Sequence, residues 1–195
     1  MSRHIALLSA VAFGALAVTA SVVLPASAED KKMMKSELSG EKTVMVGGAA
    51  MFPSKNIIQN AVNSKDHTTL VAAVKAAGLV DTLEGKGPFT VFAPTNTAFG
   101  KLPAGTVDTL VKPENKKTLT KILTFHVVPG KLEASSLTDG KKLKTVEGEE
   151  LTVRKSGDKV MIVDAKGGSS TVTIPNVNQS NGVIHVIDTV LIPAS

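Results

Sequence analysis

Two apolar segments, residues 90–100 and 181–193, constrain the fold of this chain most. The first reads Thr-Val-Phe-Ala-Pro and is typical of a strand that ends at Pro94 and turns directly into a short helix. The second is a long run of β-branched residues that opens with the turn dipeptide Asn181-Gly182. Because the two segments hold much of the best core-forming material, we expect them to pack together inside one domain.

The order of the other elements indicates an α+β fold. Ahead of Gly130, apolar residues recur mostly at helical spacing, whereas short β-prone runs separated by turn sequences follow it. Helices first and strands second favour a helical layer packed against an antiparallel sheet over an alternating parallel fold. We expect helices near residues 54–62, 66–77, 106–111 and 114–124, and strands at 89–92, 143–145, 151–155, 160–164, 171–174 and 183–192.

Residues 1–28 are typical of an export signal. A basic start at Arg3 precedes an uncharged apolar run, and Ala26-Ser27-Ala28 has the small-x-small pattern of a cleavage site. The apolar run is about as long as a membrane span, so an uncleaved anchor is the alternative. Its many small residues and Pro25 favour cleavage, and we therefore expect export of the mature chain.

The segment that follows, residues 29–53, is first polar and lysine-rich and then contains glycines. Its apolar residues recur at neither helical nor strand spacing. This composition predicts a flexible leader. The folded domain is then expected to cover residues 54–195.

Composition excludes several classes of function. The chain has no Cys, which rules out disulfides, thiolate catalysis and cysteine-held metal centres. It has no Tyr and no Trp, and only Arg3 and Arg154 are arginines, so the net charge of +5 comes from lysine. Nucleic-acid sites that read sequence depend on arginine forks and stacking aromatics. We therefore expect no nucleic-acid binding.

No arrangement of residues predicts an enzyme or a cofactor site. The chain contains no Gly-x-Ser-x-Gly nucleophile turn. A histidine metal site would require His67, His126 and His185 to converge, and no pair of them has helical or hairpin spacing. His185 and Asp188 are three apart on an expected strand, so they should face opposite sides. We expect no catalysis, no metal and no cofactor.

Three blocks of the sequence resemble the fasciclin domain, an extracellular adhesion module. Residues 90–99 match its T-V-F-A-P-T-N-x-A-F block, and residues 181–193 match its N-G-x-I-H-x-I-D-x-V-L-x-P block. Residues 125–130 resemble its Y-H-V-V-x-G block, with Phe in place of the usual Tyr. The resemblance runs from about Asn56 to Pro193. It implies a helical layer joined to an antiparallel β-sandwich or wedge-like sheet.

The resemblance also suggests residues for attachment and for structure. In the family, the Tyr-His pair and its apolar neighbours are associated with cell attachment, which makes Phe125, His126, Val127 and Val128 the candidate binding residues. The alternative is that Phe125 and Val127 pack in the core and His126 satisfies backbone groups.

Five residues of the two longer blocks form the expected structural signature. Within it, Asp188 is predicted to hydrogen-bond the turn at Thr95-Asn96 and so tie the blocks together. The signature residues are Thr95, Asn96, Phe99, His185 and Asp188.

The function that follows from the resemblance is a non-enzymatic, secreted or periplasmic adhesion module, similar to the small secreted bacterial members. We expect it to be a monomer that binds a cell-surface or matrix protein or glycan and meets a membrane only through an uncleaved signal segment. The alternative is a carrier of a small apolar or lipid ligand in a cleft between helices and sheet. An enclosed cavity of roughly a few hundred Å³ would favour the carrier.

Overall fold

The computed structural model describes residues 42–194. The chain divides into two units, residues 1–37 and 38–195, and every described residue belongs to the second. The expected export signal and the start of the expected leader, residues 29–41, lie outside the described residues. No helix within 42–194 is long and apolar enough to cross a bilayer.

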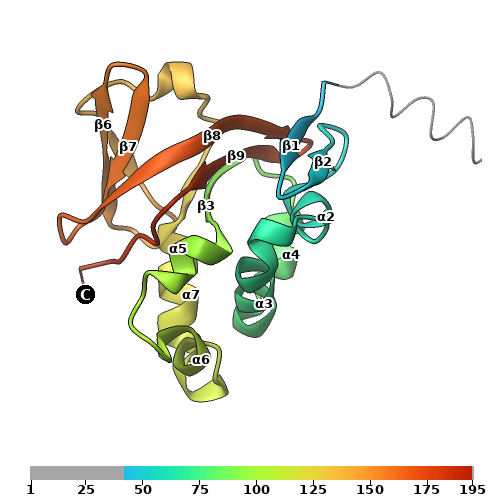
Figure 1. The fold of residues 1–195 in the computed structure, drawn as a ribbon, viewed down its shortest axis with the longest axis vertical. Coiled ribbons are helices and arrows are strands. Elements are labelled where there is room, and N and C mark those ends of the chain that lie inside the picture. The colour runs from blue at the N-terminus through green and yellow to red at the C-terminus, as the bar shows by residue number, and fades with distance from the viewer. Residues whose placement is uncertain (1–41, 195) are drawn as a thin grey trace, which may run out of the picture. The chain divides into compact units, whose positions relative to one another are not determined.

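Helices occupy most of the first half of the described chain and strands most of the second (Figure 1). The α-helices are α2 (Ile57–Ala61), α3 (Thr68–Ala77), α4 (Val80–Glu84), α5 (Asn96–Gly100), α6 (Thr106–Leu110) and α7 (Lys116–Phe125), with 3₁₀ turns η2 (Lys65–His67), η3 (Pro113–Asn115) and η4 (Ala134–Ser136). The strands are β1 (Val44–Val46), β2 (Ala49–Met51), β3 (Phe89–Pro94), β4 (Val127–Pro129), β5 (Lys142–Lys144), β6 (Glu150–Ser156), β7 (Lys159–Val163), β8 (Ser169–Gln179) and β9 (Gly182–Ile187).

Seven strands form one sheet in the order β4-β3-β9-β8-β7-β6-β5. All neighbours are antiparallel except β3 and β9, which run parallel with Thr90 opposite Val183. The two apolar segments therefore pair directly, which confirms that they pack together. The α+β class is also confirmed, with one parallel pair near the β4 edge of a mostly antiparallel sheet.

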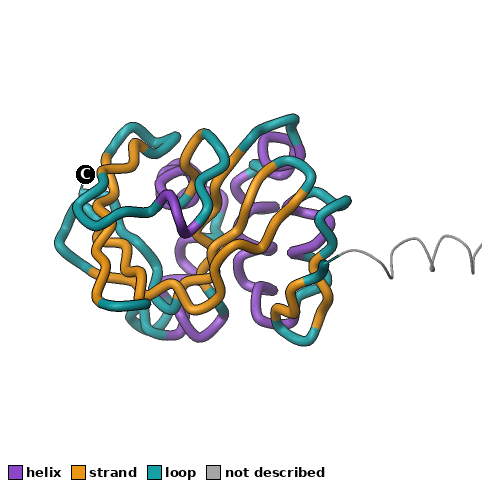
Figure 2. The backbone as a smooth tube through the Cα atoms, turned by 90° about the horizontal axis from the view of Figure 1, so that it is seen from above, coloured by secondary structure: helices purple, strands orange, loops and turns teal. Residues whose placement is uncertain are grey.

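Two apolar cores lie on opposite faces of β3 and β9. Alternate side chains explain this arrangement: Val91 faces the core under the helices, and its neighbour Phe92 faces the core formed with β5, β6 and β7. In β9, Val186 faces the core under the helices and Ile187 faces the core formed with β5, β6 and β7. In Figure 2 most helices, in purple, lie at the centre and right, whereas strands and loops form the left edge. These two strands are thus apolar almost throughout because both faces are covered.

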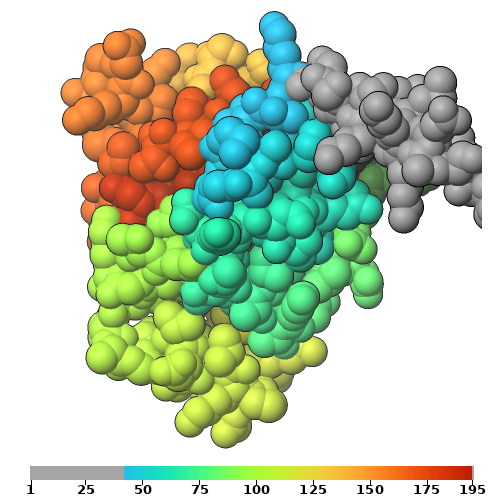
Figure 3. Space-filling model, turned by 45° about the vertical axis from the view of Figure 1, so that its right-hand side comes forward, coloured from blue at the N-terminus to red at the C-terminus, as the bar shows by residue number. Residues whose placement is uncertain are grey.

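The β1–β2 hairpin corrects the predicted domain boundary. Residues 44–51 fall inside the expected flexible leader, yet Val46 and Met51 are each only 3% exposed in the helix-side core. Gly47 and Gly48 have positive φ angles, which a tight two-residue hairpin turn requires. In Figure 3 the hairpin, in blue, lies over the teal helical segment that follows it. The folded domain therefore begins before residue 54.

Candidate functional site

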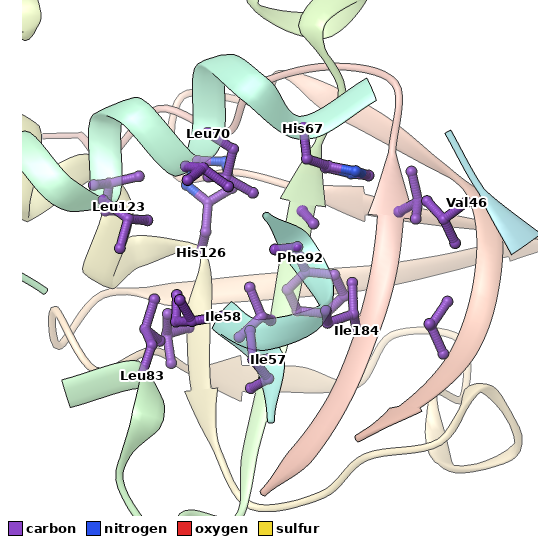
Figure 4. A pocket seen from close by; sticks show the side chains of 18 of the residues that line it. Val46, Ile57, Ile58, His67, Leu70, Leu83, Phe92, Leu123, His126 and Ile184 are labelled. Carbon is purple, nitrogen blue, oxygen red and sulfur yellow. The ribbon is translucent and has the colours of Figure 1, made fainter. Parts of the chain in front are cut away.

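An apolar pocket lies between the helical layer and the sheet, the place where a ligand cleft was expected (Figure 4). Its cavity volume is about 40 Å³. Helices α2, α3, α4 and α7 form one wall, and β3 and β9 form the other. We call it the interior pocket; its lining includes Val46, Ile58, Leu70, Leu83, Leu123 and Ile184. A volume of this size holds a few waters at most and no acyl chain.

His67 brings an unsatisfied polar atom to this pocket. It ends η2 and is 4% exposed, and its Nδ1 lies 2.9 Å from Ser64 Oγ. Burial lowers the pKa of His67, although the nearby Ala93 backbone and Asp66 charge oppose the shift. No well-aligned hydrogen bond reaches its buried Nε2 within the described chain. Burial therefore favours the neutral ring near pH 7, and Nε2 lacks a well-aligned partner although the Ala93 backbone still acts on this side chain.

His126 also borders the interior pocket, but both of its nitrogens are engaged. Its Nδ1 donates to the Ile122 carbonyl at 2.7 Å, and its Nε2 accepts from the Leu191 N–H at 3.0 Å. Burial lowers the pKa of His126 to about 4, against the Ile122 carbonyl and the Asp164 charge, which raise it. The side chain thus stays neutral and joins the end of α7 to the C-terminal segment.

All four candidate attachment residues lie in the interior. Phe125 and Val128 pack in the core toward β5–β7, Val127 packs in the helix-side core, and His126 is 2% exposed. In this conformation none of them presents a side chain to a partner. These contacts agree with the alternative in which Phe125 and Val127 pack in the core and His126 bonds backbone groups. The attachment role of these residues stays a prediction.

The expected bond from Asp188 to the Thr95-Asn96 turn is wrong. Asp188 Oδ1 instead accepts from the Thr171 N–H at 2.9 Å and the Thr189 hydroxyl at 3.0 Å. Since β9 ends at Ile187, Asp188 lies where Oδ1 bonds the start of β8 and Oδ2 pairs with Lys101 at the end of α5, away from the Thr95-Asn96 turn. Burial alone would raise the pKa of Asp188, but these bonds and the Lys101 charge outweigh it and lower the pKa.

Other contacts connect the two signature blocks. The Thr95 N–H donates to the Ile187 carbonyl at 3.3 Å, and the Thr95 hydroxyl caps α5 by accepting from the Ala98 N–H. The Asn96 side chain instead contacts η2 and the start of α3: its Oδ1 accepts from the Thr69 N–H, and its Nδ2 donates to the Lys65 carbonyl. Backbone pairing of β3 with β9, continued by the Thr95–Ile187 bond, therefore joins the two blocks, whereas the Thr95 and Asn96 side chains bond only residues 65–98.

The remaining signature residues are packing residues. Phe99 is buried under α7 in the helix-side core. His185 stacks on Phe92 with ring centroids 5.7 Å apart, accepts from the Asn176 N–H through Nδ1 and donates through Nε2 to the Leu132 carbonyl. His67 and His126 border the same interior pocket while His185 does not, and within 42–194 no three acidic or histidine side chains gather in a metal-like group.

Sequence reasoning missed the importance of Asn181. It was assigned only a turn, but its side chain donates to the carbonyls of Leu83 and Gly85 at 2.7 and 2.9 Å and accepts from the Ile57 N–H at 3.1 Å. One amide therefore joins the start of α2, the end of α4 and the start of β9. Its place in the turn dipeptide was visible, whereas its three partners are far away in sequence and gave no signal.

The sequence of this chain is similar to those of several known proteins. The family model described as Fasciclin domain matches residues 65–193. The protein sll1483 of Synechocystis is 49% identical over 153 residues, which cover 78% of this chain and 82% of that protein. The immunogenic protein MPB70 of Mycobacterium bovis is 38% identical over 138 residues, which cover 68% of this chain and 66% of that protein.

Two animal proteins share only part of their length with this chain. The transforming growth factor-beta-induced protein ig-h3 of Sus scrofa is 38% identical over 141 residues, which cover 72% of this chain and 20% of that protein. The solved FAS1 domain pair from the insect cell adhesion molecule Fasciclin I superposes with a TM-score of 0.64 at 18% identity, covering 78% of this chain and 58% of that one. Together with the family match, these similarities show that the chain belongs to the fasciclin domain family.

Proposed function

We propose that this protein is a non-enzymatic adhesion-type module that binds a cell-surface or matrix partner outside the cytoplasm. The observation that carries the proposal is membership of the fasciclin family, which includes a solved domain pair from an insect cell adhesion molecule. The cell surface glycolipoprotein MPB83 of Mycobacterium bovis, 39% identical over 153 residues, supports a place at the surface or beyond it. The partner is a protein or glycan, and the module acts as a monomer.

The absence of a convergent reactive site within residues 42–194 supports a binding role over catalysis. His67, His126 and His185 are held apart in apolar surroundings, and burial lowers the pKa of each. Catalysis needs titratable groups that meet at one cleft. No carboxylate lines the interior pocket, although the charges of Asp66 and Asp164 act on His67 and His126.

The small interior pocket also favours adhesion over ligand transport. Its volume of about 40 Å³ is far below that of a typical small-molecule site, which is roughly 300–1,000 Å³. A carrier role gains support only from the free Nε2 of His67, which would suit one polar atom on an otherwise apolar ligand. Native mass spectrometry of the purified protein tests this second function, because a carrier retains its ligand as an added mass.

Binding to surfaces tests the main proposal. The protein recovered after export is applied to intact cells and to immobilised matrix, beside bare surfaces, at low and high salt. Saturable retention on cells or matrix is the expected result. Equal retention on bare surfaces, or loss of all retention at physiological salt, would show that only the lysine charge acts and would overturn the adhesion proposal.

A further inference from the structure

Strands β5, β6 and β7 cover a core with one face and present the other face outward. Leu143, Val153 and Ile162, one from each strand, lie in the core that contains Phe92. Because side chains alternate along a strand, the residues on either side of these three point away from that core, and they are exposed or half-buried. We call this side of the three strands the outer face.

Three basic side chains lie on one diagonal across the outer face. Lys142 of β5 is opposite Thr152 of β6, and Arg154 of β6 is opposite Met161 of β7. Arg154, two residues beyond Thr152, is therefore the diagonal neighbour of Lys142. Lys159, two residues before Met161, is the diagonal neighbour of Arg154. Each diagonal step is about 7–8 Å, so the three cations form a line that crosses all three strands. We call Lys142, Arg154 and Lys159 the basic stripe.

Two of the three charges in the basic stripe are available to a partner. Within residues 42–194, no hydrogen bond or ion pair engages the side-chain nitrogens of Arg154 or Lys159. Lys142 pairs with Glu150 at 3.2 Å, but both side chains are more than half exposed, and a pair of this kind is weak. A competing carboxylate can therefore replace Glu150 at little cost.

Acidic residues near the basic stripe do not cancel its charge. Glu150 is the one acidic residue in β5, β6 and β7, and Lys144 lies directly opposite it. Asp158 precedes Lys159 in the turn, but it lines a hollow together with Lys155 and the inward-facing Val160. The outer face therefore has a positive charge that an acidic partner would complement.

The uncharged part of the outer face does not suit a neutral glycan. Thr152, Met161 and Val163 lie beside the basic stripe and are half-buried. An uncharged glycan would need aromatic rings against which to pack its sugar faces, and β5, β6 and β7 contain none. Recognition at this face therefore depends on charge.

The spacing of the basic stripe fits an extended peptide. On an extended chain, side chains two residues apart point the same way and lie about 6.5–7 Å apart. This spacing is close to the diagonal step between the cations, so acidic residues at alternate positions can reach successive members of the stripe. Arg154, at the centre, can hold its carboxylate through two parallel hydrogen bonds.

From these observations we propose that the basic stripe binds an extended segment of a partner protein with acidic residues at alternate positions. The inference rests on the adhesion function proposed above and names the face and the partner chemistry that serve it. Attraction between the charges brings the segment to the face, and the match in spacing sets its register. Binding weakens as salt rises, and the matched spacing keeps it measurable at physiological salt.

Peptides of one composition test the spacing on the whole protein. Two blocked nonapeptides contain the same glutamates and serines, one with glutamate at every second position and one with all glutamates consecutive. A third peptide has lysine in place of the alternating glutamates. Amide NMR signals of Thr152, Arg154 and Met161 report binding at physiological salt. We expect the alternating peptide to bind roughly threefold to tenfold more tightly than the consecutive one, and the lysine peptide not to bind. Equal binding of the two glutamate peptides would show attraction to charge alone and overturn the proposal.

Charge-reversal variants test the residues of the basic stripe. Arg154→Glu and Lys159→Glu change exposed positions in the stripe, whereas Lys117→Glu makes the same change at an exposed position of α7, away from β6 and β7 (Figure 1). We expect each stripe variant to bind the alternating peptide roughly tenfold more weakly and Lys117→Glu to bind it as the wild type does. Glu150→Gln should bind more tightly, because it releases Lys142. Melting curves confirm that the variants are folded.

The outcomes separate the basic stripe from the adhesion function. Surface retention that persists in both stripe variants, with no peptide shifts on β6, overturns the stripe as a binding site and leaves adhesion intact. Peptide binding at the stripe without retention of the protein on cells or matrix overturns adhesion and supports the stripe. Shifts with polygalacturonate but with neither glutamate peptide assign the stripe to an acidic glycan and also overturn the proposal.

Discussion

His126 connects two parts of the chain that are far apart in sequence, the end of α7 and the segment after β9. Truncation to alanine would remove the acceptor of the Leu191 N–H and leave a cavity beside Ile122. We expect His126→Ala to lower the free energy of unfolding by about 2–4 kcal/mol. Urea unfolding measures this loss, with exposed Lys159→Ala as the control. A variant of unchanged stability that no longer binds surfaces would contradict the structural role and support attachment.

The same residue predicts sensitivity to acid. The pKa of His126 falls from 6.5 when unfolded to about 4 when folded, so the unfolded chain binds more protons between these values. Stability is therefore complete above pH 6.5 and declines as the pH falls toward 4, by about 3 kcal/mol from this residue alone. The lowered pKa values of His67 and His185 act in the same direction.

Urea unfolding at pH 7 and pH 4.5 measures the effect. The His126→Gln variant has no titrating ring, so its difference between the two pH values should be smaller than that of the wild type. An equal difference in both proteins would locate the acid sensitivity at other groups.

At the scale of elements, Asn181 secures the ends of two helices against the start of β9. We expect Asn181→Ala to cost about 2–4 kcal/mol, because three buried backbone groups lose their partner. Asn178→Ala is the matched control, since its buried Oδ1 has no partner in the described chain. Differential scanning calorimetry should show a much larger fall in melting temperature for Asn181→Ala. Similar falls would mean that the three bonds contribute little.

Helices and strands are predicted well where the spacing of apolar residues and the positions of turn residues indicate the same boundaries. Residues 90–100 and 181–193 pair as expected, yet their parallel direction was not predicted, because periodicity reveals which faces are buried and not which way a neighbour runs. The predicted Asp188 contact was wrong for a related reason: β9 ends at Ile187 and not at residue 192, so the carboxylate bonds a different neighbour. A cleft between helices and sheet was considered, but the lining of the interior pocket was not predicted, since residues from several separate elements form it.

At the scale of the whole molecule, the β1–β2 hairpin belongs to the domain. Short strands with Ala49 and Ala50 look like part of a polar tail, and only the positions of Val46 and Met51 in the core reveal their role. A chain that starts at residue 54 exposes the α2 side of that core. We expect it to be less stable than a chain that starts at residue 38 by about 3–5 kcal/mol, from the loss of two buried apolar side chains.

Chemical unfolding of the two chains measures the difference, and Met51→Ala in the longer chain should reproduce part of it. Equal stability of the two chains would restore residue 54 as the start of the domain.

The parallel pairing of β3 with β9 sets the time at which this domain can fold during its synthesis and transport. Thr90 finds its partner Val183 only near the end of the chain, and β9 also separates β3 from β8, so neither half of the sheet can join the other without it. Folding rates fall as paired segments become more distant in sequence. If the chain is exported as proposed, almost all of it would therefore pass through the export machinery before β9 becomes available to pair. The complete sheet can therefore form only when nearly all of the chain has emerged.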